Sequence, residues 1–269
     1  FFNYAKARNC VDHMATNDFI LSLDCDEVVT ALDIDKICDL IDEGYTKFHH
    51  VQIFTQESGG NLLVKFIQCK FYNKQFNHWY SIVHEVLESY ANKVEKRGKL
   101  DESILKIDHY QNKETNRDQY IIGLAVNALR FPERDRNIHY FARDLFYSER
   151  FNSAIKMFQK HLEMNIPPQE HDTTPTHWES WVYIGNCYAR QGKLAEELEC
   201  YRKARELAPT HRRPIMMYCN FYKWHNDVEN AKVFADLAAT YPWDEKYGSS
   251  KESYEAELKE ITDWIDSKK

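Results

Sequence analysis

Several features that mark well-known protein classes are missing from this chain of 269 residues. It contains no Cys-x-x-Cys pair or other Cys-His zinc pattern, no glycine-rich phosphate loop and no Gly-x-Ser-x-Gly motif, so the enzyme classes built on those motifs lose support. No apolar run approaches the roughly 20 residues that span a bilayer. Lysine and arginine are scattered along a chain of net charge −7, which argues against nucleic acid or an anionic membrane as the main partner.

The composition predicts a globular chain with packed cores. Hydrophobic residues make up 43% and aromatic residues 14% of a length that suits one large domain or two ordinary ones. The seven cysteines are odd in number and lie mostly within apolar patterns, so we expect reduced core thiols in a cytosolic protein. The chain starts with Phe1 rather than Met, and we therefore expect the natural N-terminus to lie upstream.

The strongest chemical signal is a short apolar run, residues 19–23, that ends in the carboxylates Asp24, Asp26 and Glu27. The run predicts a buried strand with acids at its end, where ligands of open α/β sheets bind. Two carboxylates at i and i+2 can direct oxygens at one divalent cation that also takes diphosphate oxygens. The alternative, which an arbitrary Asp-x-Asp more often follows, is that the acids cap the next helix or solvate a turn.

The first half of the chain has an α/β pattern. Residues 2–16 show helical spacing before the apolar run, and helical spacing resumes from Leu32 to a C-cap at Gly44. Residues 45–110 are strand-like, including the apolar segments 82–87 and 104–107. We therefore expect the order helix, strand, acid loop, helix, followed by several strands.

From about Asp118 the pattern changes to continuous helical periodicity. The residues that match the tetratricopeptide pattern of about 34 residues are Trp181, Ile184, Gly185, Tyr188, Gly192, Tyr201, Ala204 and Pro209. Glu197 stands where that pattern has a small residue, which predicts slightly looser helix packing. Weaker matches precede and follow this unit. We assign residues 116–136 to a linker helix, 137–242 to tetratricopeptide-like repeats and 243–269 to a C-terminal capping helix.

Two clusters after the acid loop supply further candidate site residues. Glu85 is the candidate base for an inverting sugar transfer, because one carboxylate must deprotonate the attacking hydroxyl. His109 or His84 can complete a metal shell with Asp26. On a regular strand His84 and Glu85 point to opposite faces, so both reach one cavity only if the backbone turns there. The alternative is a half-buried histidine beside a surface glutamate.

Other residues allow two interpretations each. Trp79 and Tyr80 form either a stacking wall for a sugar or ordinary core. Arg8 and Asn9, in the first predicted helix, face either a phosphate or solvent. The histidines that show no ligand spacing are expected to be structural or exposed, and they include His49, His50, His139, His161 and His177.

Together, these features resemble family 2 glycosyltransferases of the GT-A fold, in particular a subgroup whose catalytic domain is followed by tetratricopeptide repeats. The resemblance is carried by residues 2–9, residues 23–27, Lys70 to Tyr72, Trp79 and residues 83–85. The predicted fold class is a truncated α/β GT-A-like catalytic domain, residues 1–115, followed by an all-α tetratricopeptide-repeat domain.

The resemblance implies an inverting transfer from a nucleotide-diphosphate sugar, expected to be UDP-linked, with Mn²⁺ or Mg²⁺ as cofactor. Its site residues, carried to this sequence, are Asp24, Arg8 and Asn9 for the nucleotide sugar, Asp26, His109 and His84 for the metal, and Glu85 as base. The acceptor would be a carbohydrate, a lipid or a protein, and the repeats would hold this acceptor or a partner peptide. The location is expected to be cytoplasmic, with peripheral association with a membrane as an alternative.

Two departures from the subgroup accompany the resemblance. Such enzymes begin with a strand-helix-strand unit that binds the base and ribose, and this chain lacks that unit. Lys70 stands where the subgroup more often has arginine, which keeps the charge but loses bidentate phosphate geometry. The second hypothesis is therefore a non-catalytic tetratricopeptide interaction protein with a remnant glycosyltransferase domain. A phosphotransferase that uses the acid loop is a third possibility, disfavoured because no phosphate-cradling loop is present.

Overall fold

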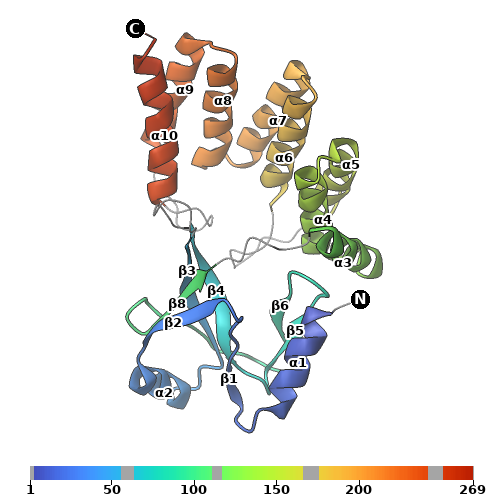
Figure 1. Cartoon of the computed structure of the whole chain (residues 1–269), viewed down its shortest axis with the longest axis vertical. Coiled ribbons are helices and arrows are strands. Elements are labelled where there is room, and N and C mark those ends of the chain that lie inside the picture. The colour runs from blue at the N-terminus through green and yellow to red at the C-terminus, as the bar shows by residue number, and fades with distance from the viewer. Residues whose placement is uncertain (1–2, 56–63, 111–116, 166–175, 242–250, 269) are drawn as a thin grey trace. The chain divides into compact units, whose positions relative to one another are not determined.

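The chain has two compact units in the computed structural model, which describes residues 3–55, 64–110, 117–165, 176–241 and 251–268 (Figure 1). The first unit comprises the described residues up to Gly123, and the second the described residues from Leu124 onward. The first unit is α/β and the second is all-helical. The predicted order of an α/β part followed by a helical part is thereby confirmed, and the finer domain boundaries stay a prediction.

The first unit is built on a mixed sheet. Its elements are α1 (Tyr4–Met14), β1 (Phe19–Leu21), β2 (Glu27–Leu32), α2 (Ile34–Asp42), β3 (Lys47–Thr55), β4 (Val64–Asn73), β5 (Asn77–Tyr80), β6 (Val86–Ser89), β7 (Arg97–Lys99) and β8 (Leu105–Tyr110). The strand order is β1-β4-β3-β8-β2, with β7 beside β3, while β5 and β6 pair separately. Strand β3 runs parallel to β7 and β8, and the other pairs are antiparallel.

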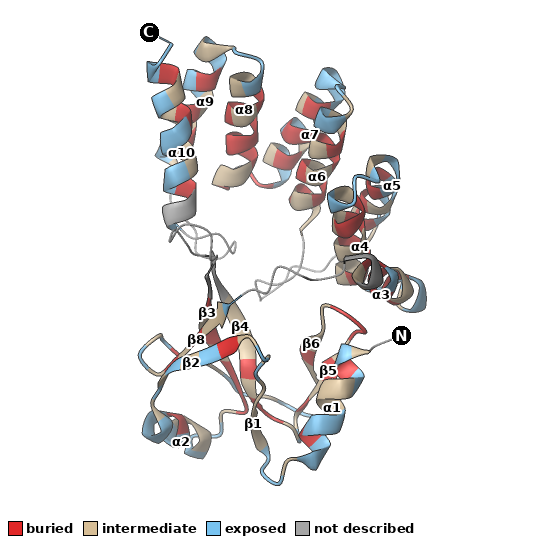
Figure 2. Cartoon of the chain, in the orientation of Figure 1, coloured by how far each residue is buried: buried red, intermediate tan, exposed pale blue. Residues whose placement is uncertain are grey.

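Two separate cores stabilise this unit (Figure 2). One joins Ile37 of α2 to Phe48, Leu105 and Ile107 of the sheet, all at most 1% exposed. The second core joins Ala5 of α1 to Tyr72, Trp79 and Leu87 of strands β4, β5 and β6. Full burial of a large apolar side chain contributes roughly 1.5–3 kcal/mol, so Ile37 helps to hold α2 on the sheet, and Ala5 lets α1 lie close to Tyr72 and Trp79.

The structure corrects the predicted element order around the acid loop. Strand β1 has only three residues, is half-buried rather than buried, and lies at the edge of the sheet. The acids are followed by β2 and not by a helix, since α2 begins at Ile34 with Asp33 as its N-cap. Strand β2 forms because Glu27–Leu32 pairs with β8, which lies about 80 residues further along the chain. Such distant pairing leaves no local periodicity.

The second unit consists of helix pairs. After α3 (Arg117–Arg130), in which the division between the units falls, come α4 (Asp135–Tyr147), α5 (Phe151–Leu162), α6 (His177–Arg190), α7 (Leu194–Leu207), α8 (Arg212–Trp224), α9 (Val228–Thr240) and α10 (Lys251–Asp266). Helices α4 and α5, α6 and α7, and α8 and α9 pack as neighbours, and α10 packs on α9 and α8. Figure 2 shows the buried residues of this stack, most densely in α8.

The α6–α7 pair packs closely at Gly185. A Cβ atom there would lie 2.5 Å from Cε1 of Tyr201, so glycine is the residue that lets the helices approach. Glu197 is buried, and its carboxylate accepts a hydrogen bond of 3.1 Å from the Tyr201 hydroxyl. Burial raises the pKa of Glu197. The helices are therefore in close contact at Gly185, and the slightly looser packing predicted from Glu197 stays a prediction.

Two buried histidines link successive helices of the second unit. The Ser180 hydroxyl of α6 lies 3.1 Å from Nδ1 of His139 in α4 and 2.8 Å from Nδ1 of His161 in α5. Burial lowers the pKa of His161 to about 4 and that of His139 well below its usual value. Both imidazoles are neutral at physiological pH, which confirms that these histidines are structural.

The cysteines divide by unit. Cys187, Cys200 and Cys219 are buried in the helical unit, where burial raises each thiol pKa to about 12. The exposed cysteines, Cys10, Cys25 and Cys38, all lie in the α/β unit. The expectation of core thiols is therefore wrong for those three.

No helix in the described part of the chain is long and apolar enough to cross a membrane.

Candidate functional site

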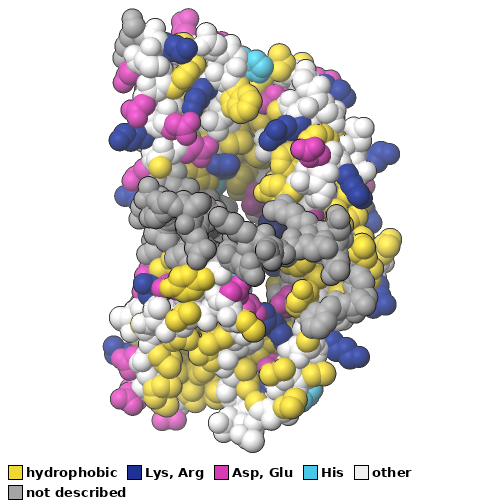
Figure 3. Space-filling view, in the orientation of Figure 1, with side chains coloured by type: hydrophobic (Ala, Val, Ile, Leu, Met, Phe, Trp, Pro, Cys, Tyr) yellow, Lys and Arg dark blue, Asp and Glu magenta, His cyan; other side chains and the backbone are white. Residues whose placement is uncertain are grey.

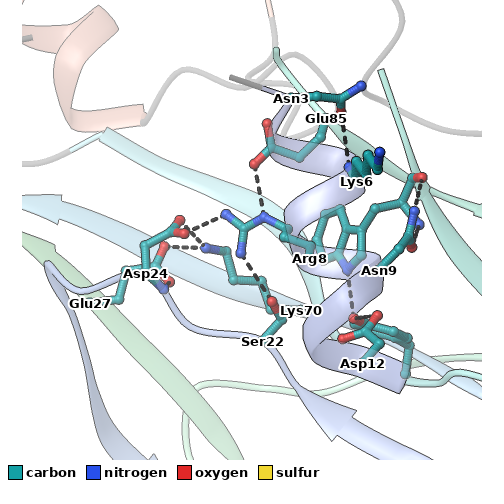
Figure 4. Close-up of polar contacts among 12 residues, drawn as sticks. Asn3, Lys6, Arg8, Asn9, Asp12, Ser22, Asp24, Glu27, Lys70 and Glu85 are labelled. Atoms are coloured by element: carbon teal, nitrogen blue, oxygen red, sulfur yellow. Dashed lines mark hydrogen bonds and ion pairs between the residues drawn. The ribbon is translucent and has the colours of Figure 1, made fainter. Parts of the chain in front are cut away.

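The candidate site forms where the acid loop between β1 and β2 meets α1 and β4 (Figure 4). Antiparallel pairing of β1 with β4 continues one residue further, where the Ser22 amide donates to the Lys70 carbonyl at 2.9 Å. This pairing places the Lys70 side chain beside the first residue of the acid loop. In Figure 4, Arg8 reaches the same loop from α1.

Arg8 joins three segments of the chain. Its Nε donates to Oε1 of Glu85 at 2.9 Å, its Nη1 donates to the Ser22 hydroxyl at 3.0 Å, and its Nη2 pairs with Oδ1 of Asp24. The Arg8 side chain is 17% exposed. The structure thus brings together Arg8, Asp24 and Glu85, three of the residues predicted from the sequence, although Arg8 and Glu85 are 77 positions apart.

Asp24 is held by two cations. In addition to Arg8, the Lys70 ammonium lies 2.8 Å from Oδ2 of Asp24. Burial opposes the charged form of Asp24, but the hydrogen bond and charge of Lys70, followed by those of Arg8, outweigh it and lower the pKa of Asp24 below its usual value. Asp24 is therefore ionised at neutral pH, and both of its oxygens are engaged.

Glu27 anchors the acid loop; in the sequence it is one of the carboxylates of this motif, but no role in the site was predicted for it. Its side chain is 1% exposed and pairs with the Lys70 ammonium and the Gln52 amide. Its second carboxylate oxygen accepts the Asp24 backbone N–H at 2.8 Å. The signal that could have found Glu27 is its position, since a carboxylate three residues after Asp24 can close a turn onto that amide.

Asp26 and His109 form a second, separate contact. His109 Nε2 lies 3.1 Å from Oδ2 of Asp26, because the pairing of β2 with β8 sets Glu27 opposite His109 and the Tyr110 amide bonds the Asp26 carbonyl at 2.8 Å. The Asp26 side chain is 37% exposed, so solutes can reach it. Within the described residues, no group of three His, Cys, Asp or Glu side chains is placed to hold a metal ion. This pair therefore offers two ligand atoms, an oxygen and a nitrogen.

The Trp79 ring packs against the Arg8 guanidinium. Asn9 clamps the Trp79 backbone with two hydrogen bonds of 2.8 Å, and the indole N–H donates at 2.6 Å to the Tyr72 hydroxyl, which donates to Asp12 at 2.6 Å. The Arg8 guanidinium lies 4.9 Å from the centre of the Trp79 ring. Trp79 is only 6% exposed, so it is a core residue and not a wall on which a sugar stacks. Asn9 likewise binds β5 rather than facing solvent.

The backbone does turn between β5 and β6, as joint access of His84 and Glu85 to one cavity would require. Ser81 has a φ of +80° and His84 a φ of +51°. Glu85 then reaches Arg8, whereas the His84 ring packs against that of Tyr120, with ring centres 4.9 Å apart. This ring contact places His84 beside Tyr120 of α3. Tyr80, at the end of β5, is half-buried.

Comparison with known proteins identifies the repeats. Residues 178–211 match the tetratricopeptide repeat family. The matched segment contains the repeat residues from Trp181 to Pro209 and corresponds to α6 and α7. The helical unit therefore contains a tetratricopeptide repeat. The α/β unit lies outside the range of this match.

Several solved structures are weakly similar to the chain. They include MamA (15% identity, TM-score 0.38, covering 46% of this chain and 67% of that one) and PcrH from Pseudomonas aeruginosa (12% identity, TM-score 0.37, covering 49% and 89%). Another is PcrH in complex with the chaperone binding region of PopB (13% identity, TM-score 0.37, covering 48% and 93%). These scores are too low to support a functional argument. No curated protein matches the chain.

The buried Lys70–Glu27 pair gives a direct test of what holds the acid loop. We expect Lys70→Met to lower the free energy of unfolding of the α/β unit by about 3–5 kcal/mol, because Glu27 would stay buried without its cation. Adding Glu27→Gln should recover more than half of the loss, and Lys70→Arg should cost much less. Urea denaturation followed by circular dichroism measures each change. A Lys70→Met protein as stable as the parent would show that this pair does not hold the loop.

Proposed function

We propose that the helical unit binds a peptide or protein segment. The match of residues 178–211 to the tetratricopeptide repeat family supports this, because stacked repeats present extended surfaces that bind such partners. The unit also carries a large apolar side chain that could serve as an anchor, Trp224 at the end of α8, which is 83% exposed. Tryptophan is enriched among the residues that dominate binding energy at interfaces.

A displayed library of random peptides, selected on the full chain, tests this proposal. We expect peptides that bind with a measurable Kd and lose about tenfold in affinity with Trp224→Ala, a loss of about 1.4 kcal/mol. Val233→Ala is the matched control, because Val233 is an exposed apolar residue of α9 that is 56% exposed. Failure to select any binder, or equal effects of the two variants, would count against a Trp224-centred binding surface.

For the α/β unit we propose metal-dependent transfer of a sugar, with inversion, from a nucleotide-diphosphate sugar to an acceptor hydroxyl. The observation that carries this proposal is the gathering of Arg8, Asp24 and Glu85 in one cluster, two residues from the Asp26–His109 pair. These residues come from the separate segments on which the resemblance to family 2 glycosyltransferases rests.

The residues at the acid loop fit a divalent cation in part. Asp26 and His109 would supply one oxygen and one nitrogen ligand, a donor set that suits Mn²⁺ better than Mg²⁺, and diphosphate oxygens and water would complete the shell. When bound, the cation would neutralise charge on the departing nucleoside diphosphate. Arg8 and Lys70 bring two further positive charges to the same loop.

Glu85 would act as the base. The acceptor hydroxyl proton passes to its carboxylate, the acceptor oxygen bonds the anomeric carbon, and the bond from that carbon to the phosphate oxygen breaks. The electron pair of the broken bond leaves with the nucleoside diphosphate. Glu85 is suited to this task by its position. Its side chain is 14% exposed, and Arg8 links it to Asp24 of the acid loop.

A second candidate function has its own observation. Both oxygens of Asp24 are already bound by Arg8 and Lys70, an arrangement that is also expected of a purely structural ion cluster. The α/β unit would then be a non-catalytic remnant attached to an interaction module. The family match, which falls in the repeats alone, agrees with this alternative.

Asp26→Ala separates the two candidates. If sugar transfer is correct, the full chain should bind Mn²⁺ and hydrolyse or transfer UDP-sugars, and this variant should weaken Mn²⁺ binding at least tenfold, because it removes a direct ligand. Asp35→Ala, at an exposed position in the first turn of α2, is the matched control and should change neither property. Calorimetry with Mn²⁺ and release of UDP measure both effects. Activity that survives Asp26→Ala in the presence of metal would refute the catalytic assignment.

A further inference from the structure

One carboxylate oxygen of Glu85, the candidate base, is already engaged in the arrangement described. Its Oε1 accepts the Nε–H of Arg8 at 2.9 Å, so the proton of an acceptor hydroxyl would have to compete with a guanidinium for this atom. The pair is also well shielded, since the two side chains are only 17% and 14% exposed. An event that removes Arg8 from Oε1 would make this oxygen available to the acceptor proton.

Arg8 is placed to respond to an anion. It contacts Asp24 in the acid loop, two residues from the exposed carboxylate of Asp26, where a metal-bound diphosphate would enter. A guanidinium binds phosphate oxygens through two parallel hydrogen bonds, so a diphosphate competes directly with the two carboxylates that hold Arg8. The Trp79 ring, held by hydrogen bonds to Asn9 and Tyr72, lies against the Arg8 guanidinium at 4.9 Å.

We propose that Arg8 locks Glu85 until a nucleoside diphosphate binds, at which point the guanidinium moves to the phosphate oxygens and frees Oε1 of Glu85 for the acceptor proton. This inference rests on the function proposed for the α/β unit and adds an order of events to it. The donor would bind first, because Oε1 of Glu85 becomes available only after Arg8 has changed partners. In this account Arg8 binds the phosphates of the sugar donor, and it acts on Glu85 as a positioning residue.

The lock predicts that removing the base strengthens donor binding. In Glu85→Gln, Arg8 no longer has to leave a carboxylate, so we expect the Kd for UDP in the presence of Mn²⁺ to fall about fivefold, the size of a moderate ion pair. A Glu85 with only a structural role would, when replaced, leave UDP binding unchanged or weaken it. Pyrophosphate with Mn²⁺ should show the same gain, because the effect concerns phosphate oxygens and not the base or ribose.

A double-mutant cycle tests whether the gain passes through Arg8. In Arg8→Gln the parent affinity for UDP should fall, and Glu85→Gln added to it should give no further gain. Arg8→Lys keeps the charge but bonds one fewer partner, so its gain should be reduced. This variant replaces Arg8→Gln in the cycle if Arg8→Gln does not fold. Glu43→Gln, at the exposed end of α2, controls for the loss of one negative charge.

The outcomes distinguish the lock from the function on which it rests. If the parent chain binds neither UDP nor pyrophosphate with Mn²⁺, the proposed function fails and the lock fails with it. If the parent binds but Glu85→Gln binds no tighter, or if the gain persists without Arg8, the lock is wrong while the donor site stands. A gain that requires Arg8 supports the lock, and calorimetry measures all of these affinities.

Discussion

The α/β unit depends on the carboxylate of Asp24 being shared between Arg8 and Lys70. This one group joins α1 to the acid loop and to β4, and through Arg8 it also reaches Glu85 in the segment after β5. Lys70 in turn is shared with Glu27, whose side chain is almost fully buried. A buried charge that loses its partner is strongly destabilising, so the acid loop keeps its conformation only while helix and strand remain docked. The contacts that form the candidate site therefore also help to dock α1 and β4 onto the acid loop.

The helical unit is held together mainly by close packing of its helices. Gly185 allows α6 and α7 to approach, and Tyr201 fills the space that its missing side chain leaves. Polar groups inside this stack bond to one another, as the Ser180 hydroxyl does to Nδ1 of His139 and of His161. Outside the stack the surface is mixed, and Figure 3 shows acidic and basic side chains interspersed on the face in view. This agrees with the dispersed charge of the sequence.

The sequence predicted the repeat register well and the α/β topology only in part. Repeat contacts are local, so the spacing from Trp181 to Pro209 was enough to place a unit that the family match bears out. Strand β2 was missed because its partner β8 is distant in the chain. The resemblance assigned Arg8, Asp24 and Glu85 to one site, and the structure brings their side chains into contact. No periodicity could indicate that the Trp79 ring packs against Arg8 or that His84 packs on α3.

The central claim is that the acid loop is a metal-dependent nucleotide-sugar site in which Arg8 exchanges a carboxylate for phosphate. Anomalous diffraction at the manganese edge, from crystals of the chain grown with MnCl₂ and UDP, tests it most directly. The account predicts one manganese ion bonded to Asp26 and His109, with the Arg8 guanidinium on the diphosphate and away from Glu85. Bound UDP with manganese elsewhere, or with the Arg8–Glu85 ion pair intact, would contradict it.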